Sequence, residues 1–90
     1  MATKRVDFKV TGTAATYWIA VDDQDVPLVN GISSIELEQT SGHVLFWWMI
    51  GNPGQSLSIV GVRGTKPVVT VKESKITQSG SGAGYRKFIV

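Results

Sequence analysis

The chain has 90 residues, enough for one domain, with no cysteine, a single histidine and a net charge of +2. Disulfides, cysteine-containing zinc sites and histidine-rich metal sites are therefore excluded, and we expect no cofactor. The nine lysines and arginines are scattered along the chain instead of forming a basic stripe, so nucleic acid is not an expected partner. No apolar run approaches the roughly 18 residues of a membrane-spanning helix, and no membrane span is expected.

The N-terminal segment alternates between apolar and charged residues over positions 5–11, which predicts a strand with one buried face. The same alternation argues against a signal peptide, whose core would be continuously apolar. The location in the cell stays open, since such a chain could be cytoplasmic or a domain excised from a longer protein. Residues 17–21 predict the second strand, with Trp18 pointing away from its inward side chains.

A hairpin is predicted next. The dipeptide Asn30-Gly31 suits a type I′ turn because both central residues of that turn take positive φ. The predicted strands on either side of the turn cover residues 26–29 and 32–38. Pro27 cannot donate a ladder hydrogen bond, which places the first of these strands at a sheet edge.

The second half of the chain is also predicted to be strands and turns. Pro53-Gly54 predicts a type II turn, and further strands are expected over residues 56–62, 67–73 and 85–90. The stretch 74–84 is rich in glycine and serine and predicts a flexible loop between the last two strands.

Residues 43–50 form the most informative segment, with one histidine followed by seven large apolar residues. Neighbouring side chains of a strand point to opposite faces, so both faces of this strand are apolar. We assign one set of side chains to the core: Val44, Phe46, Trp48 and Ile50. We assign the other set to a contact surface: Leu45, Trp47 and Met49. A slip of one residue in register would exchange the two sets.

Seven or eight short strands without helical periodicity predict an all-β protein. We expect one domain over residues 1–90, built as a small Ig-like two-sheet antiparallel sandwich, with a small β-barrel as the alternative. Over residues 21–62 the chain resembles small bacterial Ig-like and PEGA-type surface modules. The resemblance rests on a Gly-His step that opens a strand, Gly42-His43, and on the turn Pro53-Gly54. It implies the same sandwich fold.

Three patterns in the sequence resemble parts of a phosphate-binding, a calcium-binding or a catalytic site. The glycines of residues 80–84 lack the lysine and the following helix of a phosphate-binding loop. The three carboxylates of residues 22–25 lack the glycine and glutamate that an EF-hand loop requires, which leaves a different type of calcium site as an alternative. His43 could approach Glu36 or Glu38 across a ladder, but no nucleophile motif accompanies it. We therefore expect no catalytic residues and no enzymatic activity.

The functional hypothesis rests on an apolar β-face with four expected binding residues: Trp47, Leu45, Met49 and Trp18. The first reading is a binding or structural module that uses this face for contact with a protein partner or for formation of a homo-oligomer. It predicts that Trp47→Ala changes association with little loss of stability. It also predicts that Trp48→Ala lowers the free energy of unfolding by about 3–5 kcal/mol.

Two alternatives remain open at this stage. A carbohydrate could stack on Trp47 or Trp18, flanked by polar side chains of Asn52, Gln55 or Asp25. Alternatively, the irregular segments 11–16 or 74–84 could fold over the apolar face as a lid, and the face would then belong to an ordinary core.

Overall fold

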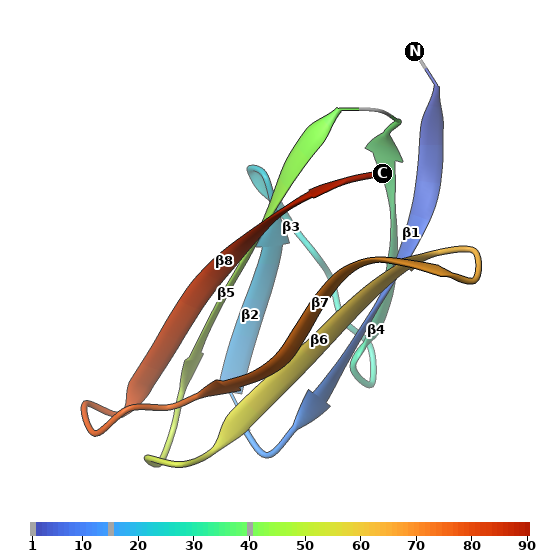
Figure 1. The fold of residues 1–90 in the computed structure, drawn as a ribbon. Coiled ribbons are helices and arrows are strands. Elements are labelled where there is room, and N and C mark those ends of the chain that lie inside the picture. The colour runs from blue at the N-terminus through green and yellow to red at the C-terminus, as the bar shows by residue number, and fades with distance from the viewer. Residues whose placement is uncertain (1, 15, 40) are drawn as a thin grey trace.

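The computed structural model describes residues 2–14, 16–39 and 41–90, and its described elements are all strands (Figure 1). They are, in chain order, β1 (Thr3–Gly12), β2 (Thr16–Val21), β3 (Gln24–Asp25), β4 (Ile32–Glu38), β5 (Gly42–Ile50), β6 (Ser56–Arg63), β7 (Lys66–Lys75) and β8 (Ser81–Ile89).

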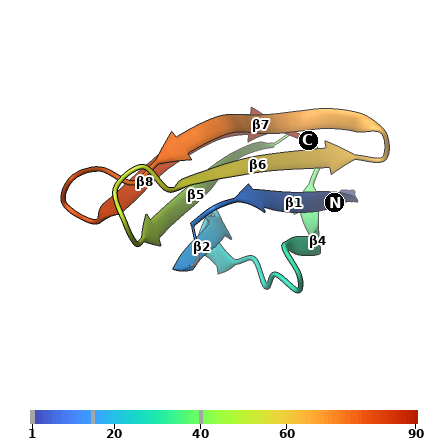
Figure 2. The same ribbon diagram turned by 90° about the horizontal axis from the view of Figure 1, so that it is seen from below.

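The strands form two antiparallel sheets of four strands each. The first sheet, here sheet A, has the order β4-β1-β6-β7, and the second, sheet B, has the order β3-β2-β5-β8. Figure 2 shows the sheets as two layers, with β1, β6 and β7 in one and β2, β5 and β8 in the other. The expected all-β two-sheet sandwich is confirmed, and each sheet keeps two separate edges instead of closing into a barrel.

The alternation predicted for the first strand is confirmed and shows how the core is built. Val6, Phe8 and Val10 of β1 are buried between the sheets. The charged residues between them face solvent. Within sheet A, β1 pairs with β4 along one edge and with β6 along the other. Each such strand buries one face against the opposite sheet, which is the arrangement that a period of two predicts.

The register predicted for β5 is wrong by one residue. Leu45, Trp47 and Met49, which were expected on a contact surface, are buried at 0%, 3% and 0% exposure. The set expected in the core lies on the other face, with Phe46 and Trp48 among its exposed members. Hydropathy could not decide the register because both faces of this strand are apolar.

Glycines of β8 explain why Trp47 is the buried tryptophan. Gly84 pairs with Trp47 in the β5–β8 ladder, and a Cβ at Gly84 would collide with the six-membered ring of Trp47. Gly82 pairs with Met49, and a Cβ there would lie 3.0 Å from the Met49 Cε. The inward glycines therefore make room for two large side chains.

The prediction of a flexible loop over residues 74–84 is correspondingly wrong for most of its length. β7 extends to Lys75 and β8 begins at Ser81. The composition of the stretch suggested flexibility, but alternate glycines in a paired strand have a packing role that composition alone does not show.

The two predicted turns are present. Asn30 and Gly31 have φ values of 54° and 77°, as a type I′ turn requires. The turn at Pro53-Gly54 is closed by a 3.1 Å hydrogen bond from the Gln55 N–H to the Asn52 carbonyl, and Gly54 has a φ of 92°. The strand expected over residues 26–29 is not formed. After β3 the chain diverges from β2, and in this stretch Val29 makes an isolated bridge to Ile32.

Candidate functional site

The outer face of sheet B carries the unusual surface of this protein. Its outward side chains come from β2, β5 and β8, and the large exposed ones are Trp18, Phe46, Trp48, Ile50, Tyr85 and Ile89. We call this set the aromatic face. Their exposed fractions run from 41% for Phe46 to 67% for Ile89.

Ladder register brings the aromatic side chains together in cross-strand pairs. Trp18 of β2 lies opposite Trp48 of β5, and their rings stack with centroids 5.4 Å apart and planes inclined by 23°. Phe46 of β5 lies opposite Tyr85 of β8, with centroids 6.3 Å apart. Such pairs stabilise a sheet, but here they also align four rings on one exposed face across three strands.

The aromatic face is large for a small domain. Aromatic side chains present about 150–250 Å² each, so the exposed fractions of the six side chains sum to an apolar surface on the order of 500 Å². Lys87, opposite Val44, adds a charged side chain on the same outward side of the β5–β8 ladder. Contiguous apolar patches of this size mark contact sites on many proteins.

The expected binding residues divide between the two faces of sheet B. Trp18 is 44% exposed and belongs to the aromatic face, on the side of the sheet opposite to Trp47, with which it was expected to lie. Trp47, Leu45 and Met49 are core residues, and the Trp47 indole N–H donates a 3.0 Å hydrogen bond to the Ser74 hydroxyl. Trp47 thus belongs to an ordinary core, and Ser74 of the segment 74–84 is part of its cover. Of the two segments considered as lids, 74–84 is mostly strand, and 11–16 includes Ala15, which is outside the described residues.

Sequence reasoning missed the exposed positions of Phe46, Trp48 and Tyr85. Phe46 and Trp48 were assigned to the core, and Tyr85 was not considered for binding. The pairing of Gly84 with Trp47 is the signal that fixes the register, but it requires knowledge of which strands are neighbours.

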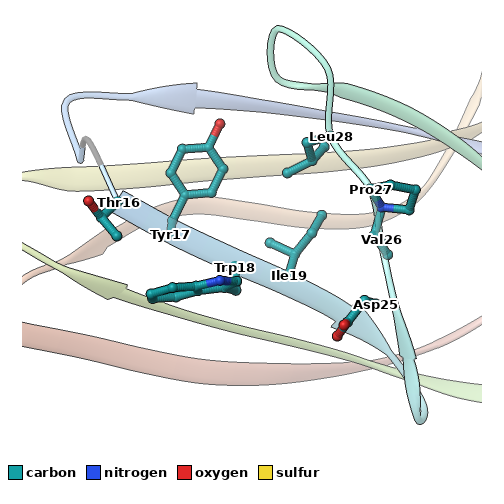
Figure 3. Close-up of a pocket in the computed structure, with 8 residues that line it drawn as sticks. All are labelled: Thr16, Tyr17, Trp18, Ile19, Asp25, Val26, Pro27 and Leu28. Carbon is teal, nitrogen blue, oxygen red and sulfur yellow. The ribbon is translucent and has the colours of Figure 1, made fainter.

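A groove of about 540 Å³ borders the aromatic face at the free side of β2 (Figure 3). The residues that line it come from β2, the end of β3 and the segment that follows: Thr16, Tyr17, Trp18, Ile19, Asp25, Val26, Pro27 and Leu28. Trp18 therefore belongs both to the aromatic face and to this edge groove. Asp25, one of the polar residues proposed to flank a stacked sugar, also lines it.

The other two polar residues proposed to flank a sugar lie in the turn after β5. The Gln55 side-chain oxygen accepts a 3.0 Å hydrogen bond from the Asn52 N–H. This bond holds the turn between β5 and β6. The structure thus brings Asp25, but neither of these amides, into the groove beside Trp18.

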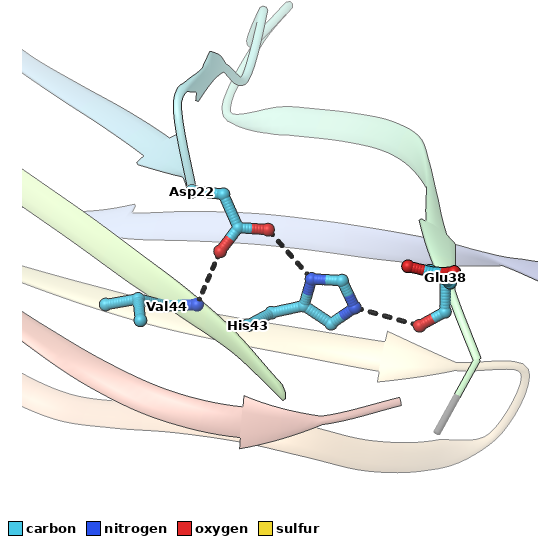
Figure 4. Close-up of polar contacts among 4 residues, drawn as sticks. All are labelled: Asp22, Glu38, His43 and Val44. Carbon is cyan, nitrogen blue, oxygen red and sulfur yellow. Dashed lines mark hydrogen bonds and ion pairs between the residues drawn. The ribbon is translucent and has the colours of Figure 1, made fainter. Parts of the chain in front are cut away.

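His43 lies at the start of β5 and joins the two sheets (Figure 4). Its Nδ1 lies 2.8 Å from the Asp22 carboxylate, and its Nε2 lies 2.8 Å from the Glu38 carbonyl oxygen. Both partners accept hydrogen bonds, so both ring nitrogens donate and the ring is the imidazolium cation. The other Asp22 oxygen accepts a 3.0 Å bond from the Val44 N–H.

The pKa values of this pair shift in opposite directions. Burial lowers the pKa of His43, but the hydrogen bonds to Asp22 and to the Glu38 carbonyl outweigh it and raise the pKa above its ordinary 6.5. Burial raises the pKa of Asp22, but the bonds from His43 and the Val44 N–H outweigh it and lower the pKa below 3.8. Both shifts favour the charged forms of the two groups and so favour an ion pair.

The surroundings of His43 favour a structural role. The expected approach of Glu36 or Glu38 to His43 across a ladder is wrong, because β4 and β5 lie in different sheets. His43 instead contacts the main chain of Glu38, and its carboxylate partner is Asp22. His43 is 6% exposed, and both of its nitrogens are occupied. Within the part of the chain that the structure describes, no three His, Cys, Asp or Glu side chains gather as a metal site would require, and no helix is long and apolar enough to cross a membrane.

Comparisons with known proteins found no matching family model, no matching curated protein and no matching solved structure. No match therefore supports the resemblance to bacterial Ig-like and PEGA-type modules.

Proposed function

We propose that this chain is a non-enzymatic binding module whose aromatic face packs against another protein surface, either a second copy of the chain or a different protein. The observation that supports it is the exposure of Trp18, Phe46, Trp48 and Tyr85 side by side on one sheet face. Tryptophan, tyrosine and phenylalanine are the residues enriched at the cores of protein interfaces.

Energetics set the expected strength of such a contact. Burying on the order of 500 Å² of apolar surface contributes about 12 kcal/mol before opposing terms. Association itself costs about 4–15 kcal/mol in lost freedom. The face is also smaller than the roughly 800 Å² per partner of a standard interface. We therefore expect a weak, reversible contact unless the partner extends beyond the face.

Sedimentation velocity over a range of protein concentrations tests self-association. The wild type is compared with a Trp18→Ser/Trp48→Ser double variant, which removes the central stacked pair. The matched control is Val60→Ser, a half-buried valine on the outer face of sheet A. We expect the wild type and the control to associate with rising concentration while the double variant stays monomeric.

A wild type that is monomeric at all concentrations would point to a different protein as partner. Affinity capture with the same three proteins would then be informative, because a genuine partner is retained by the wild type and Val60→Ser but lost by the double variant. Equal association and equal capture by all three proteins would overturn the proposal.

A carbohydrate-binding function is the second candidate, and one observation favours it. Trp18 lines the edge groove together with Asp25 and Thr16, so an indole ring lies near a carboxylate and a hydroxyl. However, the Trp18 ring is already stacked against Trp48, which reduces the indole surface open to a sugar. Titration with mono- and oligosaccharides, followed by tryptophan fluorescence, should change the emission of the wild type and leave Trp18→Ser unchanged if this function is correct.

A further inference from the structure

Sheet B is incomplete along one edge. β3 has only two residues, and they pair with Ala20 and Val21 of β2. One further bond, 3.1 Å from the Val26 N–H to the Ile19 carbonyl, continues this contact. At Thr16, Tyr17 and Trp18, β2 pairs with β5 on one side, and among the described residues no strand pairs with it on the other side.

Backbone alternation identifies the groups that this edge presents. The N–H and C=O of successive strand residues point to opposite sides of the strand, and the Ile19 carbonyl points toward β3. Tyr17, two residues earlier, therefore directs its own N–H and C=O to the same side, beyond the point where β3 ends. An edge with open donors and acceptors is a template for another strand.

The edge groove provides the space for such a strand. The segment after β3 diverges from β2, with Pro27 and Leu28 on the far side of the groove (Figure 3). The volume of about 540 Å³ lies between these residues and the open edge. An incoming strand would direct side chains alternately toward Leu28 and toward Trp18.

Charge gives the incoming strand a direction. Asp25 lies at the β3 end of the groove, and neither Asp25 nor Asp23 forms an ion pair with any described residue. A strand antiparallel to β2, like β3 itself, would begin at this end. Its first residue, or its α-amino group, would then lie close to the Asp25 carboxylate.

We infer that the edge groove binds an extended peptide, which adds to β2 antiparallel to it, with apolar side chains at alternate positions and a basic residue near its N-terminal end. This inference goes beyond the proposed function, because it concerns the edge of sheet B and main-chain hydrogen bonds instead of the aromatic face. Strand addition of this kind takes its affinity from the backbone and its specificity from alternate side chains.

Selection from a random octapeptide library against the intact chain tests the inference. We expect enrichment of peptides that alternate β-branched or aromatic residues with others and that carry Lys or Arg in the first two positions. A synthetic copy of an enriched peptide is then methylated on one backbone nitrogen at a time. Methylation at positions that face β2 should weaken binding by about tenfold or more, and methylation at the intervening positions by less than about twofold.

Two variants assign the binding to the groove. Asp25→Asn should lower the affinity of the basic peptide by about 3–10-fold, whereas Glu36→Gln, on the outer face of sheet A, should leave it unchanged. Tyr85→Ser, on β8 at the far side of the aromatic face, should also leave it unchanged, which separates this site from the aromatic face.

Three outcomes would overturn the inference. They are no enrichment over a selection without the protein, equal loss of affinity at every methylated position, and binding that is abolished by Tyr85→Ser but insensitive to Asp25→Asn. The last of these would indicate peptide binding on the aromatic face, so it would support the proposed function while contradicting the edge site.

Discussion

The two sheets of this sandwich have outer faces of opposite character. On sheet A, β1 turns Arg5, Asp7 and Lys9 to solvent, and the neighbouring β4 turns Glu36 outward. On sheet B the corresponding positions hold stacked tryptophans and a Phe–Tyr pair. A sandwich needs only its two inner faces to be apolar. The fold therefore accounts for the outer face of sheet A but not for that of sheet B.

This difference separates two roles that aromatic residues have in the chain. Trp47 and Trp48 are adjacent in sequence, yet one is 3% exposed and the other 42% exposed. Trp47 fills space above Gly84 and bonds to Ser74. Trp48 contacts Trp18 at the surface. Comparing the two positions distinguishes what stabilises the fold from what is available for binding.

The largest expected effect follows from Trp47→Ala. Removal of this buried ring leaves a cavity and an unpaired Ser74 hydroxyl, so we expect the free energy of unfolding to fall by about 3–5 kcal/mol. Trp48→Ala, which removes a half-exposed ring, should lower it by no more than about 1 kcal/mol. Urea denaturation of the two variants checks this. An equal loss at both positions would contradict the assignment of the inner and outer faces.

The ion pair of His43 with Asp22, which directly follows β2 of the same sheet, should make stability depend on pH. The raised pKa of His43 means that its contribution is fully present below pH 6.5 and is lost as the pH rises through the folded-state value. The lowered pKa of Asp22 means that its contribution is present above pH 3.8 and is lost as the pH falls. Stability from this pair is therefore greatest between these two values.

Denaturation measured from pH 4 to pH 9 tests the ion pair. We expect the wild type to lose stability across the alkaline side, because the ring then gives up the proton that one of its two hydrogen bonds requires. His43→Gln should be less stable near pH 5 and should show a flatter profile on that side. Profiles of the same shape for both proteins would show that His43 does not titrate as described.

A smaller effect is expected at Gly84, on the inner face of β8. A Cβ at this position collides with Trp47, so Gly84→Ala should lower the free energy of unfolding by about 1–3 kcal/mol. The matched control is Ala83→Ser, the adjacent exposed position of the same strand, which should be nearly neutral. Trp47→Phe should rescue part of the loss in the Gly84→Ala background. Independent, additive effects of the two substitutions would contradict the contact.

The smallest effect is expected at Ser74. Ser74→Ala leaves the buried Trp47 indole N–H without its hydroxyl partner, so stability should fall by about 1 kcal/mol. Thermal unfolding compared with that of Thr70→Ala, an exposed position of the same strand, checks this prediction. Equal stability of the two variants would mean that the hydrogen bond from the Trp47 indole N–H to Ser74 does not stabilise the fold.

Much of the fold could be predicted from the sequence because most strands have one apolar face. β1 shows this directly, since its charged residues fix which side chains point inward. β5 has two apolar faces, so its register depends on the partner strand, where Gly82 and Gly84 leave space on one side only. The partner of His43 was missed for a similar reason. Asp22 lies 21 residues away and approaches only through the pairing of β2 with β5.

The most direct test of the aromatic face as a contact site is hydroxyl-radical footprinting of the free and the associated protein. The protein is labelled at low concentration and again where sedimentation or capture shows it self-associated or partner-bound. We predict that modification of Trp18, Phe46, Trp48 and Tyr85 falls several-fold on association, while exposed residues on the outer face of sheet A are modified equally in both states. Unchanged modification of these four side chains in the associated state would contradict the account.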